Sequence, residues 1–112
     1  MMLVGILPDI SSAEILLNNL SEADFDLNTV SVIMQDVKMR DRIAKDTGPL
    51  KGVQPTMIMD RLVKAGLTQT EAKLCSDALA QSKVLVAMSV SADLLASAKE
   101  MFMDQSAQIV KE

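Results

Sequence analysis

The 112 residues predict one α+β domain, in which helices pack against a sheet built from strands of both halves of the chain. Two runs, Met2 to Leu7 and Lys83 to Val90, are apolar on both faces, which is typical of buried strands. Each run is followed by a segment with helical periodicity and then by a weaker strand signal. The two halves of the chain therefore have the same order of elements.

The first strand is expected to end at Pro8-Asp9, a pair of residues typical of turns. The next segment predicts a helix from Ser11 to about Leu20. Ser11 and Glu14 have the spacing of a capping box, and Ile10 and Ile15 have the spacing of a hydrophobic staple. These local signals are the strongest in the chain.

The second strand is expected at Thr29 to Gln35, which is rich in β-branched residues and has alternating side chains. Val30, Val32 and Met34 would then share one face of the sheet. Residues 37–52 contain Gly-Pro and a second Gly, which predicts a flexible loop.

A helical hairpin is predicted to follow this loop. Its first helix would run from Pro55 to Ala65 and end at Gly66, a residue suited to the position after a helix. Its second helix would begin at Thr68, which forms a capping box with Glu71. Their apolar faces are expected to contain Ile58, Met59, Leu62, Val63, Leu74, Cys75, Ala78 and Leu79.

The last part of the chain predicts a strand, a helix and a short strand. On the third strand, Val84, Val86, Met88 and Val90 would face one way and Leu85, Ala87 and Ser89 the other. A helix is expected from Ser91, its candidate N-cap, to about Ser106, and a last strand at Gln108 to Lys111.

This order predicts a ferredoxin-like split β-α-β sandwich with a helical insertion at residues 37–82, between the second and third strands. All 112 residues then form a single domain. The first and third strands are expected at the centre of the sheet, because they are the most apolar.

The composition argues against binding of nucleic acid. The net charge is −4, whereas phosphate contacts need clustered Lys and Arg. The chain has no Trp or Tyr to stack on bases. The helix–Gly–helix segment from Asp60 to Leu79 resembles a helix-turn-helix, but its second helix has only one cation, Lys73.

The sequence also argues against catalysis by a cofactor or by an activated nucleophile. The chain has no His and a single cysteine, so Ser-His and Cys-His pairs, His-ligated metals and disulfides within the chain are excluded. Cys75 lies on the apolar face of a predicted helix and is expected to pack in the core. The pairs Met57/Met59 and Met101/Met103 could bind copper through their thioethers, but Met at helical spacing is expected to pack in the core. We expect no enzyme activity, cofactor or metal.

The apolar N-terminus is too short for a signal peptide or a membrane span, because Pro8-Asp9 interrupts it and no basic residues precede it. The single cysteine fits a reducing compartment. We therefore expect a cytoplasmic protein that does not bind membranes.

Two polar groups are candidate sites. In the predicted sheet, Asp9 and Asp36 follow two parallel strands and Lys83 opens the strand between them, so the three would share one sheet edge. Two carboxylates on either side of a Lys could serve acid/base catalysis or bind a metal. The alternative is that they are ordinary turn residues. The second group is a basic run that could bind an anion or form a solvated surface; it comprises Lys38, Arg40, Arg42, Lys45 and Lys51.

Three segments resemble the bacterial heat-induced general stress protein family: Val4 to Leu20, Gly66 to Ala72, and Lys83 to Met88 with the helix after it. They cover about half of the chain. The charged middle segment differs from the Gly/Ala-rich insertion of that family. The resemblance implies a small ferredoxin-like domain with a stress-related role, and it implies no catalytic residue.

Two functions remain open. The first is a regulatory or scaffold module that acts through self-association or protein partners. A sheet that is apolar on both faces needs a cover, either the inserted helices or a second chain, and on this ground we expect a homodimer. The alternative is a sensor for a small anionic ligand.

Overall fold

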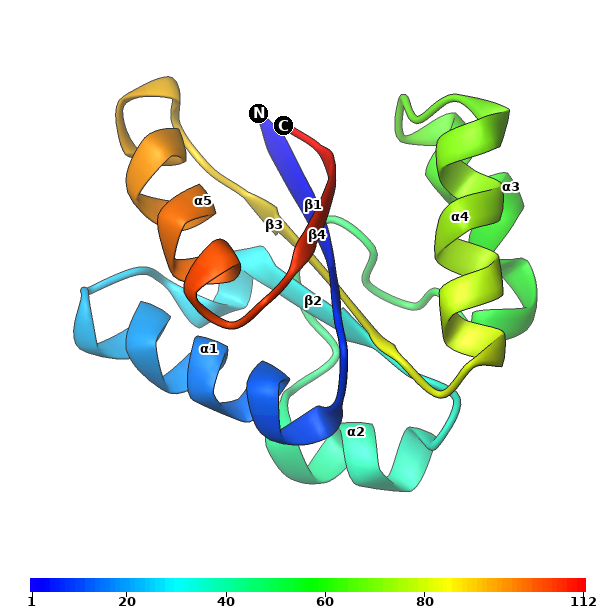
Figure 1. Cartoon of the computed structure of the whole chain (residues 1–112), viewed down its shortest axis with the longest axis horizontal. Helices are drawn as coiled ribbons and strands as arrows, with labels where there is room; N and C mark the ends of the chain where they lie inside the picture. Colours follow the sequence, from blue (N-terminus) through cyan, green and yellow to red (C-terminus); the bar gives the residue numbers. More distant parts are fainter.

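A computed structural model describes residues 1–112 as one sheet with helices on both of its faces (Figure 1). Short 3-10 turns, η1 (Leu27–Thr29), η2 (Pro55–Met57) and η3 (Ala92–Leu94), precede β2, α3 and α5. The helices and strands are β1 (Met2–Leu7), α1 (Ile10–Glu22), β2 (Val30–Ile33), α2 (Val37–Ile43), α3 (Ile58–Lys64), α4 (Gln69–Ala80), β3 (Val84–Ser89), α5 (Leu95–Asp104) and β4 (Gln108–Lys111).

The four strands have the order β2-β3-β1-β4, and every neighbouring pair is antiparallel. The α+β class predicted from the sequence is therefore confirmed, and the first and third strands are central as expected. β1 and β2 run in the same direction on either side of β3, which is the arrangement that a split β-α-β unit produces. The predicted last strand is also present.

Two apolar layers lie on opposite faces of the sheet. α1 and α5 cover one face, where they pack on side chains that include Val84, Val86 and Met88. α3 and α4 cover the other face, where Val4, Ile6, Leu85 and Ala87 are buried (Figure 1). The alternation predicted for the third strand is confirmed. Because the inserted helices cover the second face, the structural ground for expecting a homodimer is removed.

The start of α1 differs from the prediction. Asp9, not Ser11, is the N-cap, and its carboxylate accepts a hydrogen bond of 2.8 Å from the backbone N–H of Ser12. A carboxylate also interacts favourably with the positive end of the helix dipole, which explains why the N-cap lies two residues before the predicted one. The predicted Ser11 capping box and hydrophobic staple are wrong, and Ile15 is 47% exposed.

The basic stretch after β2 is not a loop throughout, because residues 37–43 form the helix α2. Asp36 caps this helix by accepting a hydrogen bond of 3.1 Å from the Met39 backbone N–H. An Asp at this position is a standard helix-start signal. The loop prediction did not use that signal, since it relied on the Gly and Pro residues that follow α2.

The inserted hairpin has the predicted capping box, formed by Thr68 and Glu71. Its apolar faces are narrower than expected, because Met59, Val63 and Leu74 are exposed. α5 begins with the 3-10 turn η3, and the side chain of its candidate cap Ser91 makes no capping hydrogen bond.

The two outer strands of the sheet are protected in different ways. β4 has four residues, an irregular register opposite Val4 and Gly5, and Lys111 near its end, all features that disfavour pairing with other strands. β2 is covered by residues 44–50, which we call the edge cover. Gly48 of this cover has a φ of +83°, and a Cβ there would lie 2.5 Å from the Val30 carbonyl carbon.

We predict that Gly48→Ala destabilises the fold by about 3 kcal/mol, since it combines a left-handed backbone with a backbone clash. Gly52→Ala is the matched control, because Gly52 has a φ of +78° and nothing within 4 Å of a Cβ. It should cost only about 1 kcal/mol. Urea unfolding measures both, and equal losses would mean that the contact with β2 contributes nothing.

Candidate functional site

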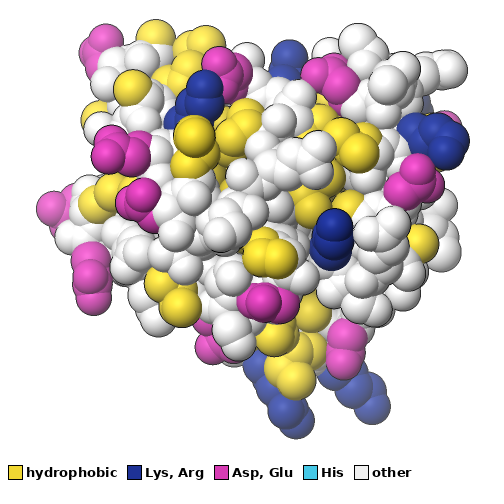
Figure 2. Space-filling view, viewed as in Figure 1, with side chains coloured by type: hydrophobic (Ala, Val, Ile, Leu, Met, Phe, Trp, Pro, Cys, Tyr) yellow, Lys and Arg dark blue, Asp and Glu magenta, His cyan; other side chains and the backbone are white.

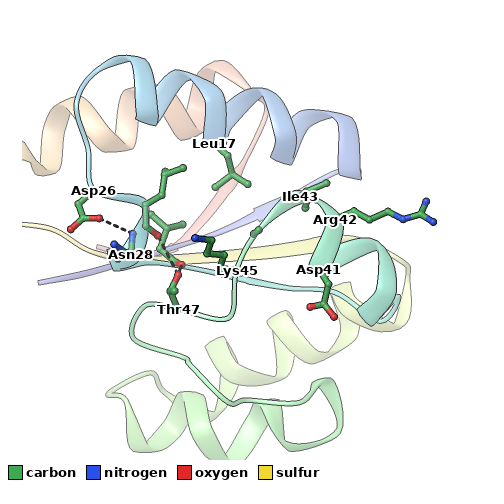
Figure 3. Close-up of a pocket in the computed structure, with 11 residues that line it drawn as sticks. Leu17, Asp26, Asn28, Asp41, Arg42, Ile43, Lys45 and Thr47 are labelled. Carbon is green, nitrogen blue, oxygen red and sulfur yellow. Dashed lines mark hydrogen bonds between the residues drawn. The ribbon is translucent and has the colours of Figure 1, made fainter.

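A cavity of about 450 Å³ opens between α1, η1, the end of α2 and the edge cover (Figure 3). Its size falls within the range of about 300–1,000 Å³ common for small-molecule sites. Its apolar lining is continuous with the core between the sheet and α1, and consists of Leu17, Leu27, Val30, Ile43 and Ala44. Its polar lining consists of Asp26, Asn28, Asp41, Arg42, Lys45 and Thr47.

Lys45 is the cation that faces this cavity. Figure 3 shows its side chain directed toward Asn28, whereas Arg42 and Asp41 point away from the centre of the cavity. Lys45 takes part in none of the salt bridges of the molecule. The charge of its ammonium group is therefore available to a ligand. We call this site the Lys45 cavity.

The carboxylate nearest to Asn28 is already used within the protein. Asp26 is the N-cap of η1, and its carboxylate accepts a hydrogen bond of 2.9 Å from the Asn28 backbone N–H. The Asn28 side chain makes no hydrogen bond within the protein, so its amide N–H groups can serve a ligand beside Lys45.

The wall that contains Lys45 and Thr47 is held against the sheet. The Thr47 Oγ1 lies 2.9 Å from the Val30 carbonyl oxygen and 3.3 Å from that of Leu27, and it donates its one proton to these acceptors. These contacts join the edge cover to β2 and η1. The shape of the cavity therefore depends on the position of the cover.

The structure brings together only part of the predicted basic run. Lys38, Arg42, Lys45 and Lys51 are all exposed, and of these four only Arg42 and Lys45 line the Lys45 cavity. Figure 2 shows Lys and Arg side chains at the lower end of the molecule, where α2 lies in Figure 1. Residues 36–51 hold five of the eleven Lys and Arg residues but only three of the fifteen Asp and Glu residues.

Arg40, the fifth member of the run, has a structural role. Its side chain is only 14% exposed, and its guanidinium contacts Asp41 at 2.8 Å and Asp46 at 3.6 Å. It also donates a long hydrogen bond of 3.4 Å to the Val32 carbonyl oxygen on β2. Arg40 therefore joins α2, the edge cover and the sheet, and it is not a free anion-binding group.

The predicted polar cluster of Asp9, Asp36 and Lys83 lies at one sheet edge, as the pairing of Leu7 with Val84 and of Ile33 with Leu85 requires. The two carboxylates cap α1 and α2, and neither forms a salt bridge with Lys83. The hydrogen bond from the Ser12 backbone N–H lowers the pKa of Asp9. No group of acidic, His or Cys side chains has a geometry that could hold a metal ion.

Cys75 is fully buried on α4, as expected. Burial raises the pKa of its thiol to about 12, and the nearby Glu71 carboxylate adds to the rise. The core prediction is wrong for Met57, Met59 and Met103, because they are exposed.

A second cavity, of about 380 Å³, lies beside the first and shares Asp26 with it. It is lined by Asp24, Asp26, hydroxyl groups and apolar side chains, and no Lys or Arg lines it. Of the two cavities, only the Lys45 cavity has the charge that suits an anion.

Comparison with protein-family models, with curated proteins and with solved structures finds no match for this chain. None of its helices has the length and apolar character that a membrane span requires. The resemblance to the heat-induced general stress proteins stays a prediction.

Sequence reasoning missed the roles of Asn28 and Thr47 at the cavity. The spacing of Asp26 and Asn28 is that of an Asx turn, a signal that could have predicted a fixed turn before β2. No comparable signal exists for Thr47, because its partners Leu27 and Val30 are 20 and 17 residues away. Only the return of the chain along β2 brings these residues together.

We predict that Arg40→Ala lowers the free energy of unfolding by about 1–2 kcal/mol, because it removes hydrogen bonds of a mostly buried side chain. The control is Arg42→Ala on the same helix, which removes an exposed cation with no salt bridge and should change stability by less than about 0.5 kcal/mol. Urea unfolding of both variants measures this. A smaller loss for Arg40→Ala than for Arg42→Ala would contradict the role given to Arg40.

We also predict that Cys75 reacts with dithiobis(nitrobenzoate) at neutral pH only as fast as the domain unfolds. The thiol is buried, and its raised pKa leaves almost no thiolate in the folded state. The reaction should become fast in denaturing urea. Fast labelling of the folded protein would show that α4 opens locally.

Proposed function

We propose that this protein is a non-enzymatic binding module for a small organic anion, which it holds in the Lys45 cavity. The observation that supports this function is an unpaired ammonium group facing a cavity with an apolar floor. The absence of His from the chain, the usual general base at neutral pH, favours binding over catalysis.

The lining of the cavity favours an anion with one negative charge and an apolar body. Lys45 is the one cation directed inward (Figure 3). Most of the negative charge of a ligand with several phosphate groups would therefore have no positive partner in the cavity. Leu17, Val30 and Ile43 offer an apolar surface for a hydrocarbon chain. An aliphatic monocarboxylate fits this description, with its head group at Lys45 and Asn28.

The other function expected from the sequence, a scaffold acting through self-association, has less support as a constitutive state. Self-association was expected because one apolar face of the sheet had no cover within the predicted frame, and α3 and α4 cover that face. A sensor, which changes state when an anion binds, agrees better with a cavity whose wall is a segment without regular secondary structure.

Isothermal titration calorimetry with octanoate tests the proposed function. Octanoate should bind the wild-type protein, and Lys45→Gln should weaken binding about tenfold or more through loss of a charge-assisted hydrogen bond. Lys51→Gln is the matched control, since Lys51 does not line the cavity and the variant has the same net charge. Octylamine and inorganic phosphate should bind weakly or not at all.

Two results would contradict the proposal. One is equal affinity of octanoate for wild type and Lys45→Gln. The other is binding of octylamine as tight as that of octanoate, because then only the apolar tail would contribute.

A further inference from the structure

The Lys45 cavity and the outer edge of β2 share one segment of the chain. Ala44, Lys45 and Thr47 line the cavity, and the edge cover to which they belong lies along β2. The floor of the cavity includes Val30, which is the first residue of β2. A movement of the cover therefore changes the cavity and uncovers the strand at the same time.

Ser31 forms the main connection between cover and strand. Its hydroxyl donates to the Thr47 carbonyl oxygen at 2.7 Å and accepts from the Leu50 backbone N–H at 2.8 Å. Ser31 is also the one polar residue in the fully buried set, with 2% exposure. Side-chain hydrogen bonds, rather than the ladder of a fifth strand, thus protect the edge of β2.

Hydrogen bonds that involve the Ser31 and Thr47 side chains join the cover to β2, and the cover buries fewer apolar side chains than the sheet does. It has no regular secondary structure, and Leu50 is the one residue within it that is buried. Segments with few buried apolar side chains open at a lower free energy than the core. Opening of the cover would break these hydrogen bonds and expose Leu50, whereas α1, α3, α4 and α5 pack on the sheet through other side chains.

We propose that an anion in the Lys45 cavity holds the edge cover closed, and that the open form pairs through β2 with β2 of a second copy of this chain. This inference rests on the proposed function. An anion that contacts Lys45 binds the closed form only, so it stabilises that form by mass action. Self-association would then be controlled by the ligand.

A second copy fits the uncovered strand because β2 is complementary to itself. The outward carbonyl groups are those of Val30 and Val32, which the side chains of Thr47 and Arg40 contact in the closed form. In an antiparallel pair of β2 strands, Val30 of each copy lies opposite Val32 of the other, and the two Ser31 residues lie opposite each other. The backbone N–H and C=O groups of Val30 in one copy then bond those of Val32 in the other. Side chains of the same type of face stay on the same side of the joined sheet. Such a contact is isologous and closes as a dimer.

The charges on either side of β2 support the same partner. The turn before the strand is acidic, with Glu22, Asp24 and Asp26. Residues 36–51 after the strand carry a net positive charge, with five cations against three carboxylates, and Lys38, Arg42 and Lys45 form no salt bridge within the chain. Antiparallel pairing places the start of one copy near the end of the other, so the acidic turn of each copy lies beside the basic segment of its partner.

The test combines hydrogen exchange with light scattering after size exclusion, with octanoate as the probe. In the wild type, octanoate at about ten times its Kd should slow exchange at Val32 about tenfold, because binding stabilises the closed form by that factor. Exchange in β1 should not change. Without octanoate, raising the protein concentration should shift the mass from 12.1 kDa toward the dimer.

Gly48→Ala should hold the cover open, so it should form dimers at lower concentration than the wild type and bind octanoate at least tenfold more weakly. Gly52→Ala is the control, because it introduces the same left-handed alanine without touching β2, and it should behave as the wild type. Thr47→Val is a second variant in case Gly48→Ala does not fold. It loses the hydroxyl contact with Val30, and octanoate should return its dimers to monomers.

The outcomes separate the two proposals. Binding of octanoate without slower exchange at Val32 would overturn the coupling and leave the proposed function standing. Failure of octanoate to bind the wild type would overturn the proposed function. Folded, strictly monomeric Gly48→Ala or Thr47→Val with fast exchange at Val32 would overturn pairing through β2.

Discussion

Val4 and Ile6 on β1, and Leu85 and Ala87 on β3, lie on the face of the sheet that α1 and α5 do not reach. A sheet that is apolar on this second face needs another layer, because an exposed apolar sheet would aggregate. The inserted helices α3 and α4 supply that layer within one chain. Most of the other features of the molecule depend on this requirement.

The path of the insertion is one of these features. The chain leaves β2 at one side of the sheet and must reach α3 on the far face, so it passes around the outer edge of β2 (Figure 1). α2 begins this path, and residues 44–50 follow the strand. Gly48 allows the backbone to approach Val30 and Ser31 more closely than any side chain would permit. The same segment that connects the two layers thus also protects the strand from pairing.

The Lys45 cavity is a consequence of that path. The end of α2 and the edge cover pass the start of β2 at the level of η1 and α1, and they leave a space that apolar side chains only partly fill. A cation on the cover then faces a floor that belongs to the core. The site is therefore built from a segment without regular secondary structure and from side chains of the core, which is a suitable basis for a response to a ligand.

The amino-acid sequence by itself determined the strands, the faces of β3 and the capping box of the inserted hairpin, because these depend on periodicity and on contacts within four residues. It also indicated the central position of β1 and β3, since both strands carry apolar residues on both faces, such as Val86 and Leu85 on β3. Only the tertiary structure decided that Arg40 is bound to the sheet while Lys45 faces a cavity. These two cations belong to one basic run, and what distinguishes them is the return of the chain along β2, which no local pattern encodes.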